Sequence, residues 1–144
     1  MKAITLLLAV PMLSLFPVLA GAQAPETEIS NLVERFFKGY VQTDENNKSD
    51  YDWTRSNPAL TRDFKRAYVK YFDQFRKQGS LDSDPILEAQ DTPETPYKAT
   101  SISSNGDRAT VEVTTAGWPG HVIRVGLVKT RGKWLINSIN KINQ

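Results

Sequence analysis

The sequence predicts an α+β fold in which two N-terminal helices pack on a curved antiparallel meander of four strands. Three observations support this class. The last third of the chain alternates apolar and polar residues in short segments separated by turn residues. The first half carries two apolar stripes at helical spacing. Without an N-terminal leader the chain keeps about 120 residues, which is enough for one domain with a single core.

The predicted strands are consecutive and closely joined. They run from Tyr97 to Ser103, from Arg108 to Thr115, from His121 to Thr130 and from Lys133 to Ile142. The connections contain Asn105-Gly106, Pro119-Gly120 and Arg131-Gly132, which are typical of tight turns. Strands joined so closely pair antiparallel. One face of this sheet is apolar and should lie under the helices, whereas the other face is mixed.

Two helices are predicted to cover the apolar face. The first begins near Glu26 and ends before Asp44, and its apolar residues recur every three or four positions. The second begins at Asn57-Pro58, because Asn is a favourable N-cap and Pro suits the first helical position. It ends at Gly79, which suits the left-handed position after a helix.

Two segments are predicted to be irregular. Residues 46–57 read as a polar linker whose aromatic residues, Tyr51 and Trp53, fold back onto the domain. Residues 81–96 show no clear periodicity and read as a long loop over the domain. Loops of this length are often functional, so this loop is a first place to look for a site.

The first 22 residues read as a signal peptide. Lys2 precedes an apolar run from Ile4 to Ala20, and Ala20-Gly21-Ala22 has the small-x-small pattern of a cleavage site. The run contains two prolines and is short for a membrane span. We therefore predict cleavage after Ala22, a single domain over residues 23–144, a periplasmic or secreted location, and no membrane attachment after cleavage.

The composition excludes several functional classes. The absence of Cys excludes thiol catalysis, thiolate metal sites and a disulfide framework. His121 is the single His, which excludes two-His metal sites, and its place beside a turn disfavours a catalytic triad. The net charge of +2 is too balanced to indicate nucleic-acid binding. Six cations on the second predicted helix read as a solvated face: Arg62, Lys65, Arg66, Lys70, Arg76 and Lys77. We expect a non-enzymatic protein without a cofactor or a metal.

Two segments supply the candidate binding residues. In the long loop they are Asp82, Asp84, Pro85, Gln90 and Asp91. Carboxylates in such a loop can hold Ca²⁺, but the spacing is not that of an EF-hand. We favour turn chemistry, in which Asp before Pro starts a turn and Asp or Gln binds nearby backbone groups. At the tip of the middle hairpin, Trp118 and His121 are candidate contacts for a protein partner.

The closing hairpin, from Leu127 to Ile139, resembles the end of the NTF2-like (cystatin-like α+β) superfamily, where a Gly-Lys turn and a Trp-x-Ile strand are common. The loop with Asp84-Pro85 and then Gln90-Asp91 is similar to a group of secreted bacterial proteins in that superfamily that have no assigned function. The resemblance covers essentially the whole chain after the leader. It implies a cone, with helices packed in a curved sheet and an internal pocket that is either open or filled. It implies no single activity, since the superfamily hosts enzymes, binding modules and interaction domains.

Three functions follow from these expectations. The favoured one is binding of a protein partner, as in small periplasmic immunity proteins that block wall-degrading toxins, and hence inhibition of a periplasmic hydrolase. The alternative is binding of a small apolar ligand in the cone. Less favoured is an isomerase or dehydratase with an acid–base pair made by an Asp and one of Tyr40, Tyr68 or Tyr71. Val122 and Val128 on the mixed face of the sheet would also suit a homodimer.

Overall fold

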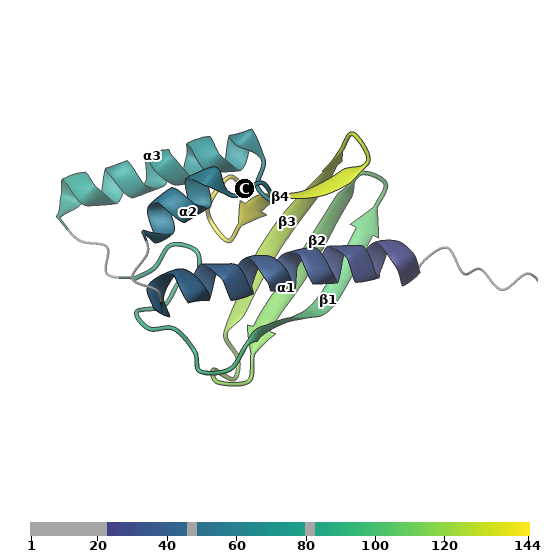
Figure 1. Cartoon of the computed structure of the whole chain (residues 1–144), viewed down its shortest axis with the longest axis horizontal. Coiled ribbons are helices and arrows are strands. Elements are labelled where there is room, and N and C mark those ends of the chain that lie inside the picture. The colour runs from purple at the N-terminus through teal and green to yellow at the C-terminus, as the bar shows by residue number, and fades with distance from the viewer. Residues whose placement is uncertain (1–22, 46–48, 80–82) are drawn as a thin grey trace, which may run out of the picture.

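Three helices followed by four strands make up the part of the chain that the structure describes (Figure 1). The computed structural model describes residues 23–45, 49–79 and 83–144. The elements are α1 (Gln23–Glu45), α2 (Asp50–Ser56), α3 (Arg62–Gln78), β1 (Tyr97–Asn105), β2 (Arg108–Thr115), β3 (Val122–Thr130) and β4 (Lys133–Ile139). The predicted α+β class is confirmed, with one helix more than expected.

The sheet is a simple meander in the order β1-β2-β3-β4, and every neighbouring pair is antiparallel. Its register shifts between Ala99 and Ser101 and between Gly126 and Leu127. Such irregularities bend a sheet, and Figure 1 shows the resulting curvature with α1 lying across one face. A Cβ at Gly126 would collide with the hydroxyl of Ser138 on β4 where it now lies, so glycine leaves room for this side chain beside the second irregularity.

The turns determine where the hairpins close. Pro119-Gly120 has the positive φ of 85° at Gly120 that a type II turn requires. Arg131-Gly132 has positive φ at both residues, 51° and 77°, which is the pattern of a type I′ turn. The first hairpin differs from the Asn-Gly turn that was expected. Asn105 pairs with Arg108 in the ladder, and Gly106, with φ of 59°, takes the first central position of a type II′ turn.

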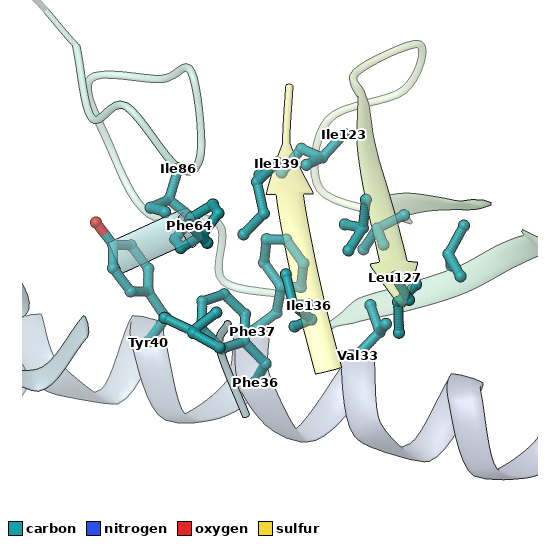
Figure 2. Close-up of a cluster of buried hydrophobic side chains, with 14 of the residues drawn as sticks. Val33, Phe36, Phe37, Tyr40, Phe64, Ile86, Ile123, Leu127, Ile136 and Ile139 are labelled. Atoms are coloured by element: carbon teal, nitrogen blue, oxygen red, sulfur yellow. The ribbon is translucent and has the colours of Figure 1, made fainter. Parts of the chain in front are cut away.

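The core fills the space between the helices and the concave face of the sheet. Figure 2 shows the apolar stripe of α1 directed at residues of β3, β4, α3 and the loop after α3. Phe37 from α1, Phe64 from α3 and Ile86 from the loop are all fully buried. Side chains therefore occupy the interior in which the resemblance implies a pocket.

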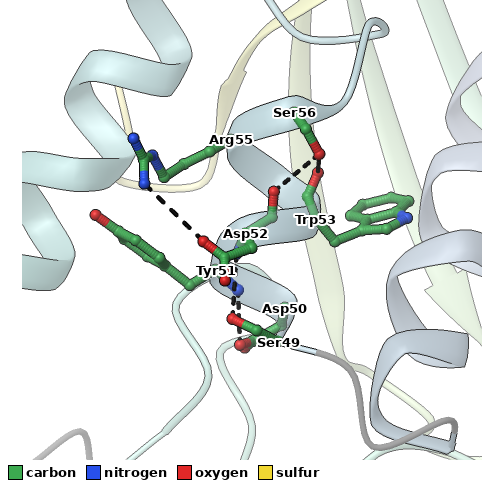
Figure 3. A network of polar contacts seen from close by, with 7 residues as sticks. All are labelled: Ser49, Asp50, Tyr51, Asp52, Trp53, Arg55 and Ser56. Atoms are coloured by element: carbon green, nitrogen blue, oxygen red, sulfur yellow. Dashed lines mark hydrogen bonds and ion pairs between the residues drawn. The ribbon is translucent and has the colours of Figure 1, made fainter.

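The expected polar linker contains α2 instead. The Ser49 hydroxyl caps this helix by accepting from the backbone N–H of Asp52 at 3.2 Å (Figure 3). Trp53 folds back as expected, and its ring lies 5.4 Å from that of Phe36 on α1. The close approach depends on Gly39, because a Cβ there would lie 2.7 Å from the Trp53 ring. A seven-residue helix is too short to show a period in the sequence.

The second predicted helix starts later than expected. Its N-cap is Thr61 rather than Asn57, which instead follows the end of α2. Between the end of α2 and the start of α3, the chain pairs with the outer edge of β4. The Ile136 N–H donates to the Ala59 carbonyl at 2.8 Å, and the Thr61 N–H donates to the Ile136 carbonyl at 2.9 Å. This pairing covers an otherwise open sheet edge. The helix ends at Gly79 as predicted, with a left-handed φ of 87°.

The last strand ends at Ile139 rather than Ile142. Asn140 adopts a positive φ of 46°, so the chain turns there and Ile142 packs back into the core. At the other end of the chain, the predicted signal peptide and its cleavage site lie in residues 1–22, outside the described residues, as does the candidate Asp82. Of the helices that the structure describes, none has the length and apolar character needed to cross a membrane.

Candidate functional site

A single carboxylate anchors the start of the long loop. Asp84 Oδ1 accepts hydrogen bonds from the backbone N–H groups of Ile86 at 2.8 Å and Leu87 at 2.7 Å. Its other oxygen, Oδ2, accepts from the Tyr40 hydroxyl on α1 at 2.6 Å. The loop is thereby folded on itself and attached to the helix below it. Burial raises the pKa of Asp84 above its ordinary value of 3.8, although these hydrogen bonds oppose the shift.

The pair formed by Asp84 and Tyr40 is the Asp–Tyr combination that the enzyme hypothesis required. Tyr40 is 2% exposed, and its hydroxyl also lies 3.4 Å from the Asp50 carboxylate. Burial, with the negative charge of Asp84, raises the pKa of Tyr40 well above its usual range. Of the other two tyrosines named, Tyr68 is buried in the same core, whereas Tyr71 packs against the Phe75 ring along α3. Because three donors already hold Asp84, the pair acts as a structural anchor.

The second candidate segment contacts the first. The His121 Nε2–H donates to the Leu87 carbonyl at 2.8 Å, and Trp118 packs edge-on against the His121 ring at 5.6 Å between centroids. The type II turn holds both residues, since the His121 N–H donates to the Trp118 carbonyl at 3.1 Å. The structure therefore joins candidates that lie more than twenty residues apart in the sequence.

A second set of hydrogen bonds, which the sequence does not predict, fixes the C-terminal end of the loop. The Thr95 hydroxyl accepts from the Gly117 N–H at 2.6 Å, and the Thr115 hydroxyl donates to the Thr95 carbonyl at 2.8 Å. A Cβ at Gly117 would lie 2.9 Å from the Thr95 hydroxyl oxygen, so glycine permits this approach. No local pattern in the sequence marks Thr95 as the partner of a turn twenty residues away. We call the joined segments, residues 83–96 and 116–121, the loop–turn platform.

The platform presents only some of the predicted residues to a partner. Pro85 is buried and Asp84 faces inward, whereas Gln90 and Asp91 are exposed. Trp118 and His121 are half-buried beside them. Gln90 and Asp91 also line a hollow of about 520 Å³ that reaches Tyr40, Asp50 and Asp84. The rim of the platform is acidic, because its exposed charged residues are all carboxylates: Glu88, Asp91 and Glu94. Across the described ranges, no three His, Cys, Asp or Glu residues gather to form a metal site.

Comparison with known proteins adds one likeness of fold. No protein-family model matches the chain, and no curated protein matches its sequence significantly. A chain in the crystal structure of the type VI native effector–immunity complex Tae3–Tai3 from Ralstonia pickettii has a similar structure, with a TM-score of 0.57. The match covers 76% of this chain and 91% of that chain, at 18% sequence identity. The two chains therefore share a fold over most of their lengths.

Proposed function

We propose that this protein binds another protein through the loop–turn platform and inhibits it, in the role of an immunity protein towards a wall-degrading toxin. The observation that carries the proposal is the fold shared with a chain of an effector–immunity complex, which extends over 91% of that chain. The predicted signal peptide adds a location, since a wall-degrading toxin acts outside the cytoplasm. The protein is then the inhibitor, and its partner is a periplasmic hydrolase.

The residue content supports the inhibitor rather than the toxin as the role of this chain. The sequence has no Cys and a single His, whose Nε2 is held by the Leu87 carbonyl. Asp84 accepts from both the Tyr40 hydroxyl and the backbone of the loop, so the Asp84–Tyr40 pair is poorly placed to exchange protons with a substrate. We accordingly propose a protein without catalytic activity.

The construction of the platform supports its use as the interface. Asp84, Thr95 and His121 each fix one part of it to another segment, so its exposed residues are ordered before a partner arrives. Preorganisation lowers the entropic cost of association. Trp118 offers a half-buried aromatic anchor, and Asp91 belongs to an acidic rim that fits a basic surface on the partner.

The alternative of a small apolar ligand has less support. Such a ligand needs an open apolar cavity, whereas Phe37, Phe64 and Tyr68 are fully buried in the interior of the cone. The homodimer through Val122 and Val128 stays a prediction. Val122 is 42% exposed on the outer face of the sheet, which leaves it accessible to a second copy or to another partner.

The proposal can be tested with a panel of type VI cell-wall hydrolase effectors exported to the periplasm of a test strain. Co-expression of this protein should restore growth against at least one effector, and the purified pair should form a stable complex in which the hydrolase is inactive. Asp91→Lys should weaken the complex about tenfold or more, because it reverses a charge on the platform. Asp73→Lys on α3 is the matched control and should have little effect. A complex that leaves the hydrolase active would contradict inhibition, and equal effects of the two substitutions would contradict the platform as the interface.

A further inference from the structure

A second hollow lies at the other end of β3 from the platform. It has a volume of about 980 Å³ and lies between the first turn of α3 and the β3–β4 hairpin. Its apolar lining is Leu60, Val128 and Leu135. Leu60 is buried, and the two strand residues are half-buried. Since β3 has nine residues and is roughly 30 Å long, this hollow is separate from the platform.

Cations dominate the rim of this hollow, which we call the basic groove. Its charged lining residues are Arg62, Arg66, Arg131, Lys133 and Asp63. Asp63 pairs with Arg66 on the same face of α3. The other three cations are exposed and form no ion pair with any residue in the described ranges. The groove also receives the positive end of the α3 dipole, which reinforces a preference for anionic groups.

One of these cations occupies an unfavourable backbone position. Arg131 has a φ of 51° at the first central residue of the type I′ turn, where Asn, Asp or Gly is preferred. For a residue with a Cβ, the left-handed region is disfavoured by contact between the Cβ and the following carbonyl oxygen. The turn needs the positive φ but not an arginine, so the use of a disfavoured residue there is a reason to look for a function of its side chain. Here the side chain contributes charge to the lip of the groove.

We propose that the basic groove binds an extended acidic segment of a protein partner, with an apolar side chain of that segment lying on Leu60, Val128 and Leu135. Charge complementarity identifies the acidic character, because the lining carries four cations and one carboxylate. The hollow shape and apolar lining fit a polypeptide better than a lipid surface, which is flat and would meet only the rim. The inference does not rest on the proposed function, since it concerns another surface and another ligand chemistry.

The test uses a fluorescent ten-residue peptide in which Asp and Leu alternate, and a second peptide in which Ser replaces each Leu. The double substitution Arg131→Asn with Lys133→Gln should weaken binding of the Asp–Leu peptide about tenfold. The control, Lys38→Gln with Lys141→Gln, removes the same charge from exposed positions outside the groove and should change binding less than twofold. The Asp–Ser peptide should bind more weakly than the Asp–Leu peptide, and added salt should weaken both.

Each contrary result overturns the inference in a defined way. Equal losses in the two double variants would show nonspecific attraction to a cationic protein. Anionic phosphatidylglycerol vesicles that bind as tightly as the peptide and are released by the groove substitutions would show a lipid-binding surface instead. No binding of the Asp–Leu peptide would remove the site. Asp91→Lys should leave peptide binding intact, so failure here and failure of the proposed function are distinguishable.

Discussion

The loop–turn platform and the basic groove lie at opposite ends of β3, and they are stabilised in different ways (Figure 1). The platform consists of loops, whose backbone groups need partners from side chains, and Asp84, Thr95 and His121 supply them. The groove lies between a helix and two strands, in which most backbone groups pair with one another, so its charged side chains do not hold the backbone. Three of its four cations, Arg62, Arg131 and Lys133, form no ion pair within the described ranges. Some polar residues in a loop stabilise the loop itself. Only the remaining polar residues indicate a binding surface.

The largest expected effect is that of Asp84→Ala on the platform. The substitution removes the acceptor of two backbone N–H groups and leaves the Tyr40 hydroxyl only its longer contact with Asp50, at 3.4 Å. We expect the free energy of unfolding to fall by about 3 kcal/mol. Hydrogen exchange should accelerate at residues 83–91 and change little at residues 131–135. A uniform acceleration over both regions would contradict the independence of platform and groove.

The same carboxylate predicts how stability depends on pH. Because burial raises the pKa of Asp84 above 3.8, the folded protein holds this proton more tightly than the unfolded chain does. The contribution of Asp84 to stability is complete at lower pH and is lost as the pH rises through the raised pKa. Asp84→Asn keeps an acceptor for the loop and cannot ionise. The free energy of unfolding of this variant, relative to that of the unsubstituted protein, should therefore increase as the pH rises through the raised pKa. Urea unfolding at a series of pH values measures the difference, and a decline would contradict the assignment.

Thr95→Val should cost about 1 to 2 kcal/mol, because the Gly117 N–H loses its acceptor while the shape of the side chain is kept. The substitution loosens the join between the loop and the second turn. We therefore expect weaker binding of the protein partner with no change in binding of the acidic peptide. Thr100→Val is a matched control on an exposed part of β1, where the hydroxyl donates to the Glu112 carbonyl at 3.2 Å and water can replace it, so it should cost less. Equal costs would show that the hydrogen bond between Thr95 and Gly117 does not stabilise the platform.

On the groove side, Thr61→Ala should cost about 1 kcal/mol, as is usual for loss of an N-cap. The Thr61 hydroxyl accepts from the Phe64 N–H at 3.1 Å and donates to Asn137 Oδ1 at 2.9 Å, so it joins α3 to β4. Thermal unfolding measures the cost. Thr61→Ser keeps the cap and should retain most of the stability. If Ser is no better than Ala, the hydroxyl does not join these two elements.

The sheet could be predicted from the sequence because its signals are local. Alternation and turn residues placed β2 at Arg108–Thr115, as observed, and placed the other strands within a few residues at their ends. The helix α2 was missed because its stability comes from Trp53 packing over Gly39, a contact between segments. The start of α3 was misplaced because Asn57 has the local features of an N-cap, whereas pairing of Ala59 and Thr61 with β4 decides where the helix begins.

The candidate site shows the same difference between local signals, which the sequence carries, and contacts between distant segments, which it does not. The loop motif and the hairpin turn indicated Asp84, Trp118 and His121, but their arrangement depends on a hydrogen bond between His121 and the Leu87 carbonyl that no local pattern specifies. The cations of α3 were interpreted as a solvated face, and the hollow beside them exists only where the helix meets the β3–β4 hairpin. The NTF2-like resemblance stays a prediction, since no family model matches the chain.

The substitution with the smallest expected effect on stability should stabilise the protein instead of destabilising it. It also separates the backbone strain at this turn position from the charge that the side chain brings to the groove. Arg131→Asn places a preferred residue at φ of 51°, so the free energy of unfolding should rise by about 0.5 kcal/mol. The same substitution should weaken binding of the Asp–Leu peptide. Arg131→Lys keeps the charge and the strain, and it should change neither quantity much. If Asn stabilises the protein without weakening the peptide complex, then the turn tolerates Arg131 for a reason other than the groove.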